Sequence, residues 1–235
     1  MSSTAPGARA RARMEVTAAI KDEARRQLAA EGAAKLSLRA VARELGMVSS
    51  ALYRYFPSRD ELLTALIIDA YDSMGESAEA AHDALADAGP AQRWTAVCEA
   101  VRGWALAHPH EYALIYGSPV PGYVAPDATI PAASRVALVF IGILRAAREG
   151  HHLAAGPPLP AELRAEAARM AADHAPDLPP ETVAALVAAW AELYGLIGFE
   201  LFGSFNRVVE DREPFFRYAV TRLAHGVGLE VPAQA

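Results

Sequence analysis

The segment from Ser37 to Glu61 constrains what this chain can fold into more than any other. Apolar residues at helical spacing predict a short helix that Ser37 caps and Gly46 ends, because glycine accepts positive φ at little cost. Ser49 offers a second cap, and a second short helix is expected over residues 50–56. Two short helices joined by a glycine-containing turn of three or four residues are typical of a helix-turn-helix.

The exposed side of the second short helix suits the major groove of DNA. Small residues at its start would let the backbone approach base edges, Arg54 would reach a guanine or a phosphate, and tyrosine hydroxyls would bond phosphate oxygens. The residues on this side are Ser49, Ser50, Ala51, Tyr53, Arg54 and Tyr55, with Arg39, Arg43 and Arg59 adding positive charge at the flanks. The alternative is a plain surface helical hairpin whose two tyrosines pack locally.

The run from Leu38 to Leu63 closely resembles the DNA-binding domain of TetR-type bacterial transcriptional regulators. The most specific part is the sequence Leu-Tyr-Arg-Tyr-Phe at residues 52–56, followed by Arg59 and two leucines. The similarity covers residues 13–65 and implies a three-helix DNA-binding domain.

The same resemblance assigns roles to single residues. It implies that Ser37 and Arg39 touch phosphate and base, and that residues 49–51 form the groove-facing start of the recognition helix. Tyr53, Tyr55 and Arg59 match positions that contact the DNA backbone. Tyr55 stands where many members have His and Arg59 where many have Lys, and both changes keep a phosphate donor.

Charge is distributed unevenly along the chain. The first sixty residues hold eleven basic and six acidic residues, for a net charge of +5, whereas the rest hold eleven and twenty-two, for −11. A basic first quarter on an acidic body suggests that one end faces a polyanion. The field near that end controls DNA contact within a Debye length of about 8 Å, so the overall charge of −6 does not argue against it.

Composition predicts an all-α fold, because the chain is rich in Ala, Leu and Arg and poor in β-branched residues. The single cysteine, Cys98, excludes an internal disulfide and suggests a reducing cytoplasm. The TetR resemblance implies a bacterial cytoplasm, with the protein on the nucleoid. The longest apolar run, residues 136–144, is nine residues long and too short to cross a bilayer, so no membrane partner is expected.

Two domains are expected: a DNA-binding domain over residues 13–65 and a larger helical domain for ligand binding and dimerisation over residues 66–230. Residues 1–12, which contain Arg9 and Arg11 and are followed directly by Arg13, are predicted to be a disordered basic arm. This arm would enter a minor groove or remain a solvated tail. Helices are expected over about 14–30, 59–86, 90–108, 111–116, 129–149, 160–174, 180–203 and 211–227.

The helix over residues 180–203 is apolar on two sides, which predicts burial on both. A stripe of large residues that includes Leu186 and Trp190 is expected to face the core of the subunit. A second copy is expected to pack on the small residues and on the last helix, and the TetR resemblance implies the same pairing. The predicted interface residues are Ala184, Ala188, Ala191, Gly195, Gly198, Phe216, Val220 and Leu223. The alternative is a central helix of a monomer.

The segment 104–123 resembles a C-terminal domain of some TetR-like regulators that is called the WHG type, and Trp104, His108 and Gly117 match its three signature residues. That resemblance implies a domain that binds a ligand and dimerises. Aromatic side chains on converging helices would line a pocket for a small apolar or aromatic effector. The candidate residues are Trp104, His108, Tyr112, Tyr116, Phe140, Trp190 and Tyr194. The alternative for each aromatic is ordinary core packing.

Catalysis is not expected, and neither is a cofactor. The sequence has no phosphate-binding glycine loop, no dinucleotide fingerprint and no nucleophile elbow. His151-His152 and Asp173-His174 lack the spacing of a His-Glu-x-x-His zinc site, and Cys98 reads as an inert core thiol. The sequence therefore predicts a regulator that binds double-stranded operator DNA as a homodimer, most simply a repressor. Two alternatives are a helical scaffolding protein and a metalloenzyme.

Overall fold

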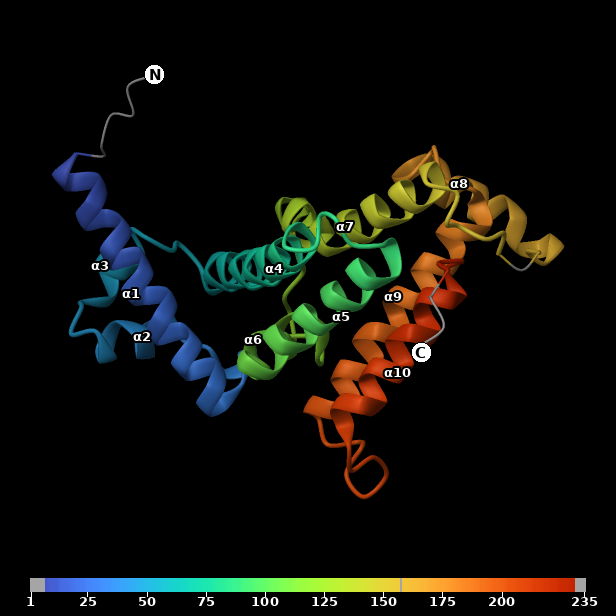
Figure 1. Cartoon of the computed structure of the whole chain (residues 1–235). Coiled ribbons are helices and arrows are strands. Elements are labelled where there is room, and N and C mark those ends of the chain that lie inside the picture. Colours follow the sequence, from blue (N-terminus) through green and yellow to red (C-terminus); the bar gives the residue numbers. More distant parts are fainter. Residues whose placement is uncertain (1–6, 157, 231–235) are drawn as a thin grey trace. The chain divides into compact units, whose positions relative to one another are not determined.

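The fold is all-α, as the composition predicts (Figure 1). The structure is a computed structural model, and it describes residues 7–156 and 158–230. Within these residues the sole strand-like feature is an isolated bridge between Leu153 and Leu229. The α-helices are α1 (Ala8–Glu31), α2 (Leu38–Glu44), α3 (Ser49–Leu52), α4 (Arg59–Asp83), α5 (Pro90–Ala107), α6 (Pro109–Tyr116), α7 (Ile130–Glu149), α8 (Arg164–His174), α9 (Pro180–Leu201) and α10 (Arg212–Gly226). Short 3₁₀ turns are η1 (Ala33–Lys35), η2 (Asp127–Thr129) and η3 (Ala161–Leu163).

The described chain divides by its internal contacts into two units. Unit 1 runs to Ala70 and also contains His108–Ile130, and unit 2 contains Tyr71–Ala107 and the chain from Pro131 on. α4 therefore begins in unit 1 and ends in unit 2. The segment of α6 and its following loop, which the sequence pattern assigned to the second domain, packs on α1 and on the apolar core of unit 1.

Unit 1 is built on one apolar core. Ile20 and Ala24 of α1, Val41 of α2 and Leu52 of α3 are completely buried. Leu62 and the apolar residues that follow it on α4 complete the cluster, as their helical spacing predicts. α1 lies across α2 and thereby makes a three-helix unit with α2 and α3.

The predicted disorder of residues 7–12 is wrong, because α1 starts at Ala8. Alanine and arginine are among the best helix formers, so they extend a helix that is already nucleated by its packed half. The guanidinium of Arg13 lies 5.1 Å from the centroid of the Tyr55 ring. The remainder of the expected arm, residues 1–6, lies outside the described residues.

α6 is held in unit 1 by charged and polar contacts. The guanidinium of Arg25 on α1 donates to Glu111 on α6 at 3.0 Å and to Asp69 on α4 at 2.8 Å. Lys21 donates to the same Asp69 at 2.7 Å. In the loop after α6, the hydroxyl of Tyr123 shares a 2.9 Å hydrogen bond with that of Thr64 on α4. These half-buried contacts tie α1, α4 and α6 together.

In unit 2, α5, α9 and α10 pack on one another. The ring centroids of Trp94 on α5 and Phe140 on α7 are 4.5 Å apart. The indole N–H of Trp94 also donates to the carbonyl of Val220 on α10 at 3.2 Å. Arg102 on α5 donates two hydrogen bonds of 2.7 Å to Glu200 on α9, whose carboxylate is buried. This ion pair joins two helices inside the core of unit 2.

A close crossing joins α4 to α7 in unit 2. Arg135 on α7 donates to Glu79 at 2.7 and 2.9 Å and to Asp72 at 2.9 Å, both on α4. The arginine lies against Gly75, where an added Cβ would come within 2.7 Å of the Arg135 Cβ. Glycine at position 75 therefore makes room for the arginine, whose pKa these hydrogen bonds raise further.

The segments Asp127–Glu149 and Pro180–Leu201 are each long and apolar enough to cross a membrane. This result rests on length and composition, and the core helices of soluble proteins meet the same criterion. The inward residues of α7 and α9, such as Ile143 and Ile197, are buried within the described structure. α7 and α9 therefore each contribute a buried apolar side to unit 2.

Replacement of Glu200 by Gln is expected to destabilise unit 2. The change leaves the half-buried Arg102 guanidinium without a charged partner, which costs about 2–4 kcal/mol of unfolding free energy. Thermal unfolding monitored by circular dichroism should show a clear fall in Tm. The matched control is Asp177→Asn, because Asp177 accepts two hydrogen bonds of 2.7 Å from Arg145 at an exposed site. Equal losses of Tm in the two variants would contradict a special role for the buried pair.

Candidate nucleic-acid interface

The turn between α2 and α3 forms as the sequence predicts. Ser37 caps α2 by accepting a hydrogen bond of 3.4 Å from the backbone N–H of Ala40. Gly46 has a φ of +64°, and its N–H donates to the carbonyl of Arg43 at 3.1 Å. The N–H of Met47 donates to the carbonyl of Ala42 at 2.8 Å, which completes a Schellman motif. This ending fixes the direction in which the chain leaves α2.

α3 is shorter than the predicted helix over residues 50–56. The residue that precedes it is Val48, which is extended, and Ser49 is the first helical residue rather than a side-chain cap. The chain continues after Leu52 as tight turns, in which the N–H groups of Tyr55 and Phe56 donate to the Leu52 carbonyl at 2.8 and 3.1 Å. The prediction that Ser49 caps this helix is therefore wrong, because the helix starts one residue earlier.

The polar side of this segment faces solvent while its apolar side is locked in the core. Leu52 is 0% exposed and Phe56 is also buried, whereas Tyr53 between them is 41% exposed. Ala51 is half-buried, so its small side chain lies at the edge of the surface. The exposed predicted DNA-contacting residues are Arg39, Ser49, Ser50, Tyr53 and Arg54. We call these five side chains the α2–α3 face.

Two cations of the α2–α3 face, Arg39 and Arg54, have no acidic partner among the residues that the structure describes. Arg43 beside them differs, since it pairs with Glu44 at 3.2 Å in an exposed setting. Unpaired guanidinium groups next to serine and tyrosine hydroxyls can donate several hydrogen bonds to an anion. The arrangement therefore suits a polyanion such as a nucleic-acid backbone.

Arg59, which is predicted to contact the DNA backbone, makes hydrogen bonds to the backbone of the protein itself. Its guanidinium donates to the backbone carbonyls of Ala33 at 2.9 Å, Ala34 at 3.2 Å and Leu36 at 3.2 Å. These contacts fasten η1, the turn that leads into α2. Arg59 thus holds the α2–α3 face in place from behind, a role that sequence spacing did not reveal because the acceptors are backbone atoms far away in sequence.

Tyr55 is also more inward than its neighbours. Its ring is half-buried, packs on the core of unit 1 and lies under the Arg13 guanidinium. Ser37 is half-buried as well, since its hydroxyl serves as the cap of α2. The structure thus places Ser37 and Tyr55 at the border of the exposed surface and joins them to the framework that supports it.

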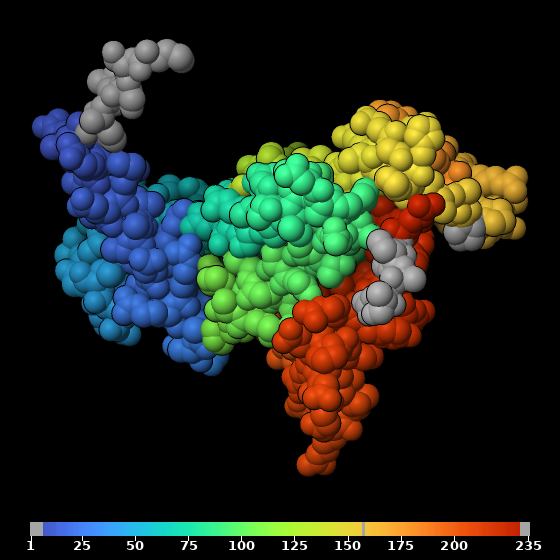
Figure 2. Space-filling view, viewed as in Figure 1, coloured from blue at the N-terminus to red at the C-terminus, as the bar shows by residue number. Residues whose placement is uncertain are grey.

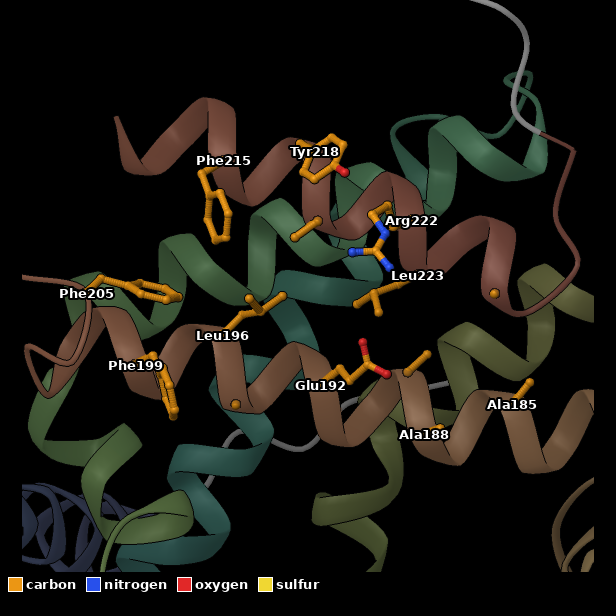
Figure 3. Close-up of a pocket in the computed structure, with 14 residues that line it drawn as sticks. Ala185, Ala188, Glu192, Leu196, Phe199, Phe205, Phe215, Tyr218, Arg222 and Leu223 are labelled. Atoms are coloured by element: carbon orange, nitrogen blue, oxygen red, sulfur yellow. The ribbon is translucent and has the colours of Figure 1, made fainter. Parts of the chain in front are cut away.

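α9 and α10 line an apolar groove on unit 2 (Figure 3). The predicted small residues on α9 lie on its outer side: Ala188, Ala191 and Gly195 are exposed, and Ala184 and Gly198 are half-buried. On α10 the prediction is wrong for Phe216 and Val220, which are buried in the chain's own core, whereas Leu223 is buried but lines the groove. The exposed or half-buried groove residues of α10 are instead Phe215, Tyr218, Ala219 and Arg222.

The predicted ligand residues are divided between the two units. Trp104 is buried in unit 2 and donates to the Ser73 hydroxyl at 2.9 Å, and Phe140 is buried against Trp94. Tyr112 and Tyr116 pair on α6 in unit 1, with ring centroids 5.3 Å apart. His108 is the residue before α6 and makes no side-chain cap.

The other two aromatics sit on α9. Trp190 and Tyr194 pair with ring centroids 5.5 Å apart, but Trp190 is 40% exposed. The expectation that Trp190 faces the core with the large stripe is therefore wrong, although Leu186, Leu193 and Ile197 of the same stripe are buried. The groove between α9 and α10 is lined by none of the seven predicted ligand residues.

Other reactive side chains make no cluster in the described part of the chain. Burial raises the pKa of the Cys98 thiol well above its usual range, and the side chain is completely buried. His152 pairs with Glu230 at 3.7 Å, and both are exposed. No three His, Cys, Asp or Glu side chains gather as metal ligands among the described residues.

Comparisons with known protein families cover both parts of the chain. Residues 20–66 match the family described as "Bacterial regulatory proteins, tetR family", and residues 94–223 match "Tetracyclin repressor-like, C-terminal domain". The first match contains the α2–α3 face, and the second contains the lining of the groove between α9 and α10 except Gly226.

Relatives and solved structures agree with these matches. The HTH-type transcriptional regulators Rv1816 of Mycobacterium tuberculosis and Mb1846 of Mycobacterium bovis are each 40% identical over 206 residues, covering 85% of this chain and 86% of the relative. The solved structure of SCO4313, described as regulatory, is 35% identical with a TM-score of 0.76, covering 92% of this chain and 98% of the other. RolR in complex with resorcinol shares the fold at 16% identity and a TM-score of 0.54, covering 96% and 100%.

The exposed helix-turn-helix face and these matches lead to one conclusion. The chain belongs to the TetR family of bacterial regulatory proteins, and it is a DNA-binding transcriptional regulator rather than an enzyme.

Proposed function

We propose that this regulator is a ligand-responsive repressor that binds a palindromic operator as a homodimer in the bacterial cytoplasm. The observation that carries the DNA-binding part is the α2–α3 face. Its polar residues face solvent on a segment that Leu52 anchors completely, and Arg39 and Arg54 offer unpaired guanidinium groups. Arginine, serine and tyrosine at such a segment suit base edges and phosphates.

The homodimer is supported by the surface of unit 2. Trp190, Phe199 and Phe202 on and after α9 and Phe215 and Tyr218 on α10 are 36–61% exposed. Three of them, Phe199, Phe215 and Tyr218, line the groove between α9 and α10, and exposed apolar side chains gathered in this way are typical of an interaction site. Figure 2 shows the chain between α9 and α10, drawn in orange, projecting from the surface of unit 2. A second copy covering α9 and α10 would remove this apolar surface from water.

The mechanism follows from two-fold symmetry. Two α3 segments would occupy successive major grooves, about 34–36 Å apart on one face of the DNA. A ligand that favours a different spacing of the two segments would oppose DNA binding through linkage. α4, which belongs to unit 1 up to Ala70 and to unit 2 beyond it, is the continuous element that would carry the change.

The effector is proposed to be a small apolar or aromatic molecule bound in a WHG-type domain. Gly117, the third signature residue, ends α6, and an added Cβ there would lie 2.3 Å from the carbonyl oxygen of Ala113. Glycine at this position is therefore a steric requirement of the turn. RolR, of the same fold, was solved with resorcinol, so the fold can hold a small aromatic molecule. The effector contacts proposed for this chain remain the seven aromatic and histidine candidates named above.

The test of the proposed function starts with the selection of bound duplexes from a random DNA pool. The enriched sequences should contain a two-fold symmetric motif with half-sites about one helical turn apart. Titration of that duplex should show that Arg39→Ala weakens binding roughly 10- to 100-fold and makes the salt dependence less steep, by about 0.9 for each lost phosphate contact. Tyr53→Phe should weaken binding by less.

The control for these variants is Arg43→Ala, since Arg43 is exposed but already paired with Glu44. It should change the affinity less than Arg39→Ala does. The proposal fails if no sequence is enriched, or if Arg39→Ala and Tyr53→Phe both bind like the wild type.

Arg59 is expected to behave differently from Arg39. Arg59→Ala removes three hydrogen bonds to the turn before α2 and should lower the unfolding free energy of the protein by about 1–3 kcal/mol. Arg39→Ala should leave the stability nearly unchanged, because its side chain is exposed. Chemical denaturation of both variants, measured beside their DNA affinity, separates the two roles. A fully stable Arg59→Ala variant would contradict the supporting role of this residue.

A further inference from the structure

The groove between α9 and α10 has a volume of about 630 Å³, and apolar or small residues form most of its lining. On α9 the lining residues recur at helical spacing, with Glu192 between Ala188 and Gly195. On α10, which forms the other wall of the groove, the charged lining residue is Arg222. Glu192 and Arg222 are the charged residues of this lining, one acid and one base.

Figure 3 shows Glu192 and Arg222 on the two walls of the groove, facing each other at the same level. Both are exposed, and neither has an ion-pair partner within 4.0 Å among the residues that the structure describes. Other arginines of unit 2 near these helices differ in this respect, since Arg102 pairs with Glu200 and Arg217 pairs with Glu99 and Glu213. Glu192 and Arg222 therefore differ from these arginines in having no ion-pair partner in the described part of the chain.

A second copy covering the groove would take both charges out of water. An unpaired charge in a buried interface is costly, whereas a paired and hydrogen-bonded one costs far less. In a two-fold dimer the same surface is used twice, so a contact from residue i to residue j of the partner is repeated from j to i. Because Glu192 and Arg222 lie at the same level, Glu192 of each copy can pair with Arg222 of the other, which gives two ion pairs in one dimer.

We propose that Glu192 of one copy forms an ion pair with Arg222 of the other, and that this pair of contacts selects the partner and sets the register of the dimer. The inference rests on the homodimer proposed above. The apolar residues of the groove add buried surface, but they can pack in more than one relative position of the two chains. The two ion pairs form in only one register. They also disfavour a related chain that carries two like charges at these positions.

The test is a charge exchange read out as the dimer dissociation constant by sedimentation equilibrium. Glu192→Arg and Arg222→Glu should each weaken self-association about 100-fold, because each places like charges opposite one another. The double variant should return to near the wild-type value. An equimolar mixture of the two single variants should form heterodimers at near the wild-type value, because each acid then faces a base.

The matched control is Glu162→Arg, which makes the same change at an exposed site outside the groove and should leave association unchanged. Circular dichroism spectra of the single variants should match that of the wild type, since both side chains are exposed in the single chain.

Two results would overturn the inference while leaving the dimer intact. Single variants that associate like the wild type would show that the charges do not meet. Weakened single variants whose mixture does not recover would show that Glu192 and Arg222 act within one chain. A wild-type chain that stays monomeric at micromolar concentration would instead overturn the proposed homodimer itself. DNA selection with the monomer would then show separately whether the proposed DNA binding stands.

Discussion

The burial of Leu52 is the constraint on which the rest of this structure depends. The segment proposed to meet DNA, α3, is four helical residues long, which is too short to be stable by itself. Its direction comes from Leu52 and Phe56 in the core of unit 1, and from the Gly46 turn that aims the chain after α2. Because these anchors are apolar and inward, the side chains next to them in sequence are left for contact with the outside.

The support for that segment reaches further than the three-helix unit. Arg59 at the start of α4 fastens the turn before α2, and Arg25 on α1 joins α4 to α6 through Asp69 and Glu111. The α6 segment is therefore part of the unit that binds DNA, although about forty residues of chain separate it from Ala70. A displacement of α6 would therefore alter the half-buried ion pairs that join it to α1 and α4.

Much of the fold could be predicted from the sequence because its signals are local. The Ser37 cap, the Gly46 turn, the Ser58 hydroxyl that accepts from the N–H of Glu61 in the first turn of α4 and the apolar stripe of α4 depend on neighbours within a few residues. The errors occurred where distant contacts decide. The sequence pattern placed Phe216 and Val220 at the surface, but α10 is apolar on two sides, with Phe215 and Tyr218 one position before and two after Phe216. Helical spacing alone does not tell which of two apolar sides faces the chain's own core. The partners of Arg59 are backbone carbonyls. Every residue has a backbone carbonyl, so the residue types in the sequence do not indicate which ones accept these hydrogen bonds.

The central claim, that α3 lies in the major groove of an operator, can be tested by DNA cleavage from a tethered reagent. The native thiol, Cys98, is fully buried with a raised pKa, so a cysteine introduced as Ser50→Cys would be modified selectively by an iron-chelate reagent. On a selected duplex, the account predicts two cleavage patches in the major groove, centred about 34–36 Å apart. Cleavage spread evenly along the duplex, or none in the presence of bound protein, would contradict it.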